Sequence, residues 1–330
     1  MIRYLKRTHN VLREAWLAPR AKKNETIFSR IYKAYLNYEC NHGIEKYLNE
    51  QSNNSIISPL NEWDYCDELD EYHHYYESTY FANGQIRLKN INKKKLIIFL
   101  SGYYSNSDDV FINKSHPQYL VKKCKDENIS LASWSTINQG SRAQNAIYKN
   151  LNSVVSVERE YSRFLPLLGT SIWNEYVHEL SYCIKMISNF YNNDIEICTV
   201  GWSMGGAFAH LAPLLCDTCK MTISAGSLAR YSDLLLEGNT RLQGYFFYPF
   251  NNRYFDLENI IRESINHGAT TIFLYGENDP GCLKSTRIYL KKEFKKEANF
   301  LIKEFKNDGH FFLPNIKNEI FNQINNHSVK

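Results

Sequence analysis

The sequence lacks a long apolar run and a second pair of closely spaced cysteines. No stretch reaches the about 18 consecutive apolar residues of a membrane-spanning helix, and the first residues, MIRYLKRTHNVLREAW, contain no apolar core of a signal peptide. The eight cysteines include one CxxC pair, Cys216 and Cys219, without the second ligand pair of a zinc site. We therefore expect reduced thiols, no metal, no cofactor, no transmembrane segment and a cytoplasmic location.

A large net charge is also missing. A formal charge of +4 over 330 residues gives no electrostatic argument for nucleic acid as a partner. The charge is uneven, because residues 1–33 contain nine Lys or Arg and two Glu, whereas residues 50–86 contain eight Asp or Glu and no Lys or Arg. Apolar residues from Ile2 to Trp16 recur at helical spacing. We interpret this basic helix as packing against the main domain, with docking to a membrane surface or a protein as the alternative.

The pattern of the sequence changes near residue 76. Residues 1–75 lack strand-like alternation and predict a helical N-terminal extension, within which the Asn- and Ser-rich segment 49–58 is interpreted as a linker. Residues 76–330 are expected to form the main domain, starting with a hairpin around Asn83-Gly84. At 43% hydrophobic and 22% charged residues, the composition is typical of a folded globular protein.

Strands and helices alternate through the main domain. Continuous apolar runs predict buried strands at 96–100, 129–134, 195–200, 221–225, 271–275 and 300–305, with helices at about 172–191, 204–216, 283–297 and 316–326. Such alternation predicts an α/β fold with a mainly parallel sheet flanked by helices.

The segment Gly201-Trp202-Ser203-Met204-Gly205 fits the G-x-S-x-G nucleophile elbow. It follows a predicted buried strand and precedes an Ala- and Leu-rich helix, which is the context the motif requires. A serine on so sharp a turn has a strained backbone, and small residues two positions away let strand and helix approach closely. Over about residues 76–326 the chain resembles the α/β-hydrolase superfamily of serine esterases and related acyl-transfer enzymes.

The resemblance implies an acid and a base after late strands, in the order Ser, Asp or Glu, His. Asp279 follows the predicted strand 271–275 and is the expected acid, with Glu277 and Asp308 as rivals. His310 follows the last predicted strand and is the expected base, which takes the Ser203 proton while Asp279 orients the imidazole.

The resemblance also implies an oxyanion hole made by two backbone N–H groups. Met204, which follows the nucleophile, is expected to supply the first. The second belongs to the loop after the strand 96–100, where Ser101 stands in place of the familiar histidine. Tyr103 is the expected second donor and Tyr104 the alternative.

Aromatic and polar residues surround the predicted mouth of the site. We expect a small cap at about 227–265, rich in Tyr and Phe between 245 and 255, with closure of the core edge as the other interpretation. Tyr104, Trp134, Arg142 and Trp202 are the candidate substrate-binding residues. Arg142 would favour an anionic group.

Three functions are compatible with these residues. The first is a serine hydrolase that acts on a small-molecule or carbohydrate acyl ester, with water attacking the acyl-Ser203 intermediate. The alternative is an O-acyltransferase, for example an O-acetyltransferase on a carbohydrate such as capsule polysaccharide, in which a hydroxyl replaces water. A non-enzymatic binding module is a third hypothesis, against which the intact Ser203, Asp279 and His310 set argues.

Overall fold

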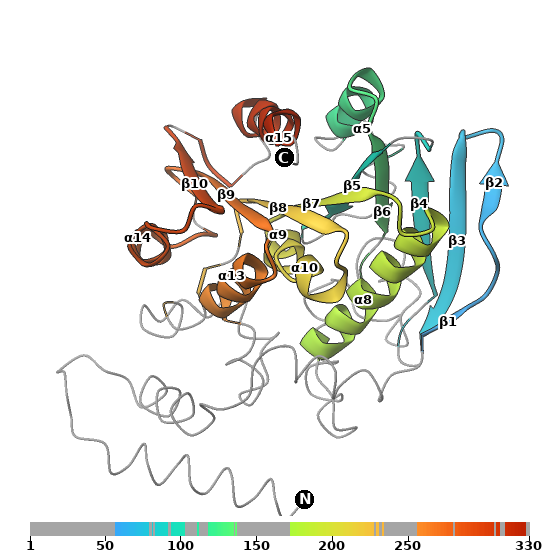
Figure 1. Ribbon diagram of the computed structural model, residues 1–330, viewed down its shortest axis with the longest axis horizontal. Helices are drawn as coiled ribbons and strands as arrows, with labels where there is room; N and C mark the ends of the chain where they lie inside the picture. Colours follow the sequence, from blue (N-terminus) through green and yellow to red (C-terminus); the bar gives the residue numbers. More distant parts are fainter. Residues whose placement is uncertain are drawn as a thin grey trace, which may run out of the picture.

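The computed structural model describes the sheet, its helices and the loops around Ser203. The described residues are 57–78, 81, 83–91, 94–102, 111, 118–134, 136, 172–227, 229–230, 233, 256–279, 281–306, 308–310 and 314–327. Within them, ten strands form a single sheet in the order β1-β3-β4-β6-β5-β7-β8-β9-β10, with β2 paired to β3 (Figure 1). The basic helix expected from Ile2 to Trp16 lies outside the described residues.

Six parallel strands form the larger part of the sheet. They are β5 (Lys95–Leu100), β6 (Ser130–Trp134), β7 (Glu196–Trp202), β8 (Cys219–Ala225), β9 (Thr270–Gly276) and β10 (Phe300–Phe305). Each matches a strand predicted from an apolar run. The runs are continuous because helices cover both faces of a parallel sheet and bury alternate side chains on each side. In β5, for example, Leu96 and Ile98 enter one core cluster and Ile97 enters the other.

The two faces of the sheet carry different sets of helices (Figure 1). Residues of α5 (Gln118–Asp126) and α15 (Pro314–Asn326) pack in one core cluster. On the other face lie α8 (Ile172–Phe190), α9 (Met204–Ala209), α10 (Ala212–Leu215), α13 (Leu257–Asn266) and α14 (Lys284–Glu293). The helix predicted at 204–216 is two short helices, because the chain turns at His210 and Leu211 before Pro213 starts the next helix.

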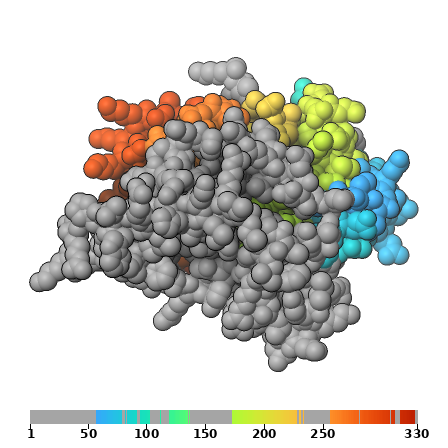
Figure 2. Space-filling view, turned by 90° about the horizontal axis from the view of Figure 1, so that it is seen from below, coloured from blue at the N-terminus to red at the C-terminus, as the bar shows by residue number. Residues whose placement is uncertain are grey.

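The sheet begins before the boundary predicted at residue 76. Strands β1 (Ile57–Pro59), β2 (Asp64–Cys66) and β3 (Glu71–Ser78) are antiparallel, and β3 pairs with β4 (Gly84–Lys89). The expectation of a helical extension is therefore wrong for residues 57–75. Figures 1 and 2 place these strands at one end of the molecule and β10 and α14 at the other.

The hairpin expected around Asn83-Gly84 is present as the β3–β4 pair, but the turn is not at these two residues. Gly84 is already in β4, directly opposite Tyr76. A Cβ atom at Gly84 would lie 2.1 Å from Cζ of the Tyr76 ring. The glycine thus makes room for a fully buried tyrosine whose hydroxyl donates to Glu179 Oε1 at 2.7 Å.

The cap expected at about 227–265 ends in a helix that packs on the sheet. Leu257 and Ile261 of α13 are buried with Phe273 of β9, so residues 257–265 belong to the helical layer. This corrects the C-terminal limit of the expected cap. The expected aromatic residues between 245 and 255 lie outside the described residues.

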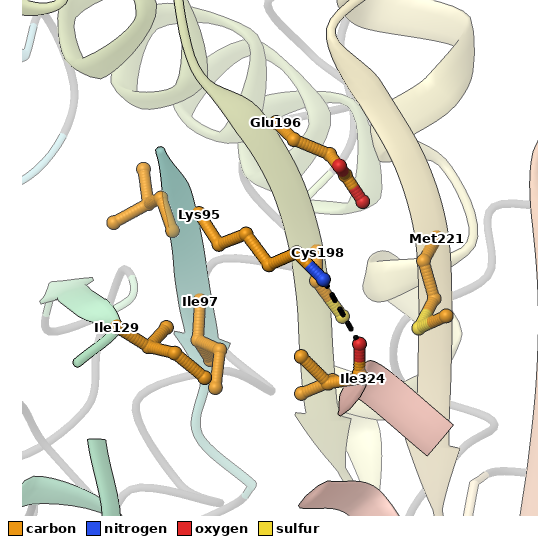
Figure 3. A pocket seen from close by; sticks show the side chains of 8 residues that line it. Lys95, Ile97, Ile129, Glu196, Cys198, Met221 and Ile324 are labelled. Carbon is orange, nitrogen blue, oxygen red and sulfur yellow. Dashed lines mark hydrogen bonds between the residues drawn. The ribbon is translucent and has the colours of Figure 1, made fainter. Parts of the chain in front are cut away.

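A small cavity lies at the edge of the sheet opposite Ser203. It measures about 10 Å³, room for no more than one water molecule. Lys95 reaches from the start of β5 to the end of α15, where its Nζ donates to the carbonyl oxygens of Ile324 and His327 at 3.2 and 3.3 Å (Figure 3). This cation stabilises the C-terminal end of a helix and leaves no space for a substrate.

Seven cysteines lie in the described part of the chain, and all seven are free thiols. Burial raises the pKa of Cys219 to about 12, so this thiol stays protonated near neutral pH. In the same part of the chain, no helix combines the length and apolar character needed to cross a membrane.

Candidate active site

Ser203 stands on a sharp turn between β7 and α9. Its backbone has φ 55° and ψ −118°, a combination that residues with a side chain rarely adopt. The turn is possible because strand and helix touch: a Cβ at Gly201 would lie 2.0 Å from the carbonyl oxygen of Gly205. The glycines of the motif are therefore required by close backbone contact, and the strained turn predicted from the sequence is present.

The structure brings Ser203, His310 and Asp279 together from three loops. His310 Nε2 lies 2.8 Å from Ser203 Oγ, and His310 Nδ1 lies 2.7 Å from Asp279 Oδ1. The Asp279 side chain is fully buried, whereas 28% of the His310 side chain is exposed. The three loops follow β7, β9 and β10, whose carboxyl ends meet at one edge of the sheet, where open α/β sheets bind ligands.

Asp279 is held by the start of the segment that leads into α14. Its Oδ1 accepts hydrogen bonds from the backbone N–H groups of Gly281 at 2.7 Å and Cys282 at 3.3 Å. On its other side is Gly226, which has φ +59° and where a Cβ would lie 2.7 Å from Asp279 Oδ2. The aspartate is thus fixed in direction and shielded from solvent.

The other two candidate acids have different surroundings. Glu277 lines a groove with Lys284 and Arg287, away from the imidazole. The backbone carbonyl of Asp308 accepts from the N–H of Asn278 at 2.9 Å. This hydrogen bond joins the loop after β9, which carries Asp279, to the loop after β10, which carries His310. Of the three candidate acids, Asp279 is the one whose carboxylate contacts His310.

Comparisons with known proteins identify the fold. No protein-family model matches the sequence, and no curated protein matches it. Among solved structures, acetyl xylan esterase 1 from Thermoanaerobacterium sp. JW/SL YS485 is 13% identical with a TM-score of 0.54, covering 86% of this chain and 94% of that one. A putative acetyl xylan esterase from Bacteroides fragilis NCTC 9343 gives 13% and 0.54, covering 83% and 76%.

Together with the sheet order and the elbow, this likeness is decisive for the architecture. The chain has the α/β-hydrolase fold. A third similar structure, the acetyl xylan esterase of Paenibacillus sp. R4, is 12% identical with a TM-score of 0.50 and matches 97% of this chain and 99% of its own. At such low identity the likeness concerns the fold and not the substrate.

The loops expected to form the oxyanion hole are described in part. Met204 is buried and is the first residue of α9, so its N–H has no acceptor one turn earlier within the helix. Gly102 ends the described part of the loop after β5, and a Cβ there would lie 3.1 Å from Ser203 Cβ. The loop thus passes beside the nucleophile. Tyr103 and Tyr104, the two expected second donors, lie outside the described residues.

The candidate substrate-binding residues differ in where the structure places them. Trp134 is 1% exposed and packs in the hydrophobic core with Trp173 and Tyr176 of α8, so the expectation that it faces the mouth of the site is wrong. Arg142 lies outside the described residues. Trp202 is half-buried beside Ser203, and its indole Nε1 donates to the backbone carbonyl of His310 at 2.9 Å.

His210, directly after α9, is a packed core residue. It is fully buried, its Nδ1 lies 2.7 Å from Thr222 Oγ1, and its ring stacks on Phe273. Burial lowers the pKa of His210 to about 3 because a charged imidazole would be desolvated there. The residue is therefore neutral at physiological pH.

Arg287 contributes to the site in a way that the sequence did not indicate. From α14 its Nη1 donates to the carbonyl oxygens of Gly276 at 2.8 Å and Glu277 at 3.0 Å, at the start of the turn that carries Asp279. A count of the Lys and Arg residues on α14 cannot show that one of them is 9% exposed.

The described residues do not contain a group of three or more His, Cys, Asp or Glu side chains that could hold a metal ion.

Proposed function

We propose that the protein is a serine ester hydrolase in which Ser203 is the nucleophile, His310 the general base and Asp279 the orienting acid. The observation that carries this proposal is the continuous contact from Ser203 Oγ through both ring nitrogens of His310 to Asp279, on a strained elbow. A hydroxyl is a weak nucleophile unless an adjacent base removes its proton, and this arrangement supplies the base and fixes its direction.

The reaction then proceeds in two halves. His310 Nε2 takes the Ser203 proton as Oγ attacks the ester carbonyl, and it returns that proton to the leaving alcohol. Asp279 accepts a hydrogen bond from Nδ1–H and stabilises the imidazolium. The Met204 N–H donates to the oxyanion of the tetrahedral intermediate, a contribution that in other enzymes is worth about a hundred- to a thousandfold in rate. Water, deprotonated by the same imidazole, releases the acyl group from Ser203.

Acetyl esters of carbohydrates are the first substrate class to test. The solved structures named above include acetyl xylan esterases, and this chain carries 24 Tyr and 18 Phe, side chains that suit surfaces contacting sugars. The fold hosts many chemistries, so this support is for a choice of substrates and not for a specificity.

The test is a panel of acyl esters, including acetylated xylose and 4-nitrophenyl esters of increasing chain length, run with and without added sugar hydroxyl acceptors. We expect release of free acid at a rate that the acceptors leave unchanged, and no release by Ser203→Ala. An acylated acceptor formed at the expense of free acid would instead identify a transferase. A folded protein that reacts with no ester would contradict the proposal.

A further inference from the structure

Trp202 connects the strand that carries the nucleophile to the loop that carries the base. It is the last residue of β7 and directly precedes Ser203. Its Nε1–H donates to the backbone carbonyl of His310 at 2.9 Å, and its ring centroid lies 6.2 Å from that of His310. On its other side, a Cβ at Gly102 would lie 3.4 Å from Trp202 Cε3. The indole therefore lies between the loop after β5, where the second oxyanion donor is expected, and the loop after β10, which carries His310.

The contact acts on the backbone of His310 rather than on its ring. Both ring nitrogens are already engaged, by Ser203 and by Asp279, and these contacts depend on where the backbone of residue 310 is held. Two residues before His310, the carbonyl of Asp308 accepts a hydrogen bond from the N–H of Asn278, which joins this loop to the loop that carries Asp279. The bond from Trp202 ties residue 310 itself, and it does so from the strand that ends at the nucleophile.

We infer that Trp202 is a positioning residue that sets the distance between His310 Nε2 and Ser203 Oγ through its hydrogen bond to the His310 carbonyl. This role rests on the proposed function and replaces the expectation of a substrate contact for Trp202. Because Trp202 ends β7 and Ser203 directly follows it, any small movement of this strand carries both, and the Ser203–His310 distance is preserved. A misplacement of about 1 Å between reacting groups can cost a hundredfold in rate, so such a tether has a measurable effect.

The experiment replaces Trp202 with 3-benzothienylalanine, in which sulfur takes the place of the indole N–H while the two fused rings remain. The probe is a fluorophosphonate, whose concentration dependence separates binding (KI) from the rate of bond formation to Ser203 (kinact). We expect kinact to fall about three- to tenfold, the range for one lost hydrogen bond, with KI unchanged within about twofold. The same replacement at Trp63, which packs against His74 and Phe190 at the far end of the sheet, should leave both constants unchanged.

Each other outcome overturns the inference. An increase in KI with unchanged kinact would show that the indole contacts the ligand. Unchanged constants would show that the bond does not position His310; a lower melting temperature beside them would show that it stabilises the fold alone. Trp202→Phe provides the same comparison if the analogue does not fold. A wild-type protein that is not labelled at Ser203 would contradict the proposed function instead, so the two failures are distinguishable.

Discussion

At the scale of single residues, the site combines strain at Ser203 with firm support for its partners. The strained serine backbone persists because both sides of the turn are packed: Ser203 N donates to Ala225 O at 3.0 Å, and Gly206 N donates to Ser203 O at 3.0 Å. Asp279 is buried and receives two backbone N–H groups. In the proposed reaction, such preorganisation means that little rearrangement is needed when the tetrahedral intermediate forms.

The first prediction concerns the three residues that act together. We expect Ser203→Ala and His310→Ala each to lower turnover of an ester substrate by at least about a thousandfold, because members of a triad act as one unit. Asp279→Asn should lower it by about a hundred- to ten-thousandfold through the wrong histidine tautomer. Steady-state kinetics with melting curves test this. A variant at Ser203 or His310 that is folded and retains full activity would refute the assignment.

A second prediction concerns the pH dependence of stability at His210. The folded state keeps His210 neutral down to a pKa of about 3, whereas an unfolded histidine binds its proton below about pH 6.5. Between these values the unfolded state binds more protons, so the free energy of unfolding falls as the pH falls. His210→Leu should remove up to about 1.4 kcal/mol per pH unit of this slope.

Urea denaturation at several pH values between 4 and 7 measures how steeply the free energy of unfolding changes with pH in the wild-type protein and in His210→Leu. His267→Leu, which changes an exposed histidine at the end of α13, provides the control and should leave the wild-type slope unchanged. Parallel pH profiles for wild type and His210→Leu would show that His210 is protonated in the folded protein.

At the scale of elements, α14 supports the acid turn. The turn from Gly276 to Asp279 is bound from two sides, by the N–H groups that precede the helix and by Arg287 within it. Arg287 also lies over the Tyr275 ring, with Cζ at 4.8 Å from the ring centroid. The helix therefore fixes both the backbone before Asp279 and the carboxylate itself.

This arrangement predicts that Arg287→Met lowers both stability and turnover. The carbonyl of Gly276, which also accepts from Asp279 N at 3.1 Å, and the part-buried carbonyl of Glu277 both lose the charged donor, and a hydrogen bond to a charged group contributes about 1.5–3 kcal/mol. We expect a lower melting temperature and a fall in kcat of about tenfold, with partial recovery in Arg287→Lys. Arg262→Met is the control, because Arg262 is half-exposed and pairs with Glu293 on the surface; its effect should stay within about 0.5 kcal/mol. An Arg287→Met protein with wild-type kinetics would show that Arg287 of α14 is not needed to position the turn that carries Asp279.

The elements also show where sequence patterns suffice and where they fail. The six parallel strands were predictable because burial on both faces gives continuous apolar runs. Strand β3 was not, because its sequence EYHHYYES contains polar residues that are buried in pairs. Glu71 accepts from Arg87 Nε at 2.6 Å, and His74 Nε2 lies 2.9 Å from the hydroxyl oxygen (Oη) of Tyr182. No local pattern distinguishes such paired polar residues from a solvated segment.

The site divides in the same way. Ser203, Asp279 and His310 were found because each follows a predictable strand and the elbow has a sterically required pattern. The hydrogen bonds of Trp202 and Arg287 end on backbone carbonyl groups that are distant in the sequence, 108 residues away for Trp202 and 11 or 10 for Arg287. The spacing of residue types in a sequence cannot reveal a contact whose acceptor is a backbone carbonyl, because every residue has one.

In the molecule as a whole, the antiparallel strands belong to the same sheet as β7, β9 and β10, whose ends carry Ser203, Asp279 and His310. Tyr76 is completely buried in the main core cluster, and Glu71 and Arg87 are each 1% exposed. The boundary near residue 76 therefore cuts through the core. Of the residues described, those from Ile57 onward all belong to one structural unit with the site.

Two truncations test this conclusion. A chain that starts at Glu77 loses β1, β2 and most of β3, and it leaves Arg87 buried without Glu71, which alone costs about 3–5 kcal/mol out of the about 5–15 kcal/mol of a typical domain. We expect it not to fold. A chain that starts at Ile56 keeps every described strand and should fold and react with a fluorophosphonate. A folded chain from Glu77, seen by circular dichroism, would contradict the account of the core.

The central claim is that Ser203 is the nucleophile and that His310 activates it. The most direct measurement is peptide mapping by mass spectrometry after brief exposure of the full chain to a fluorophosphonate, in parallel with His310→Ala. We predict one adduct, on Ser203, formed at least about a thousandfold more slowly in the variant. An adduct on another serine, no adduct on the folded protein, or equal rates with and without His310 would contradict the claim.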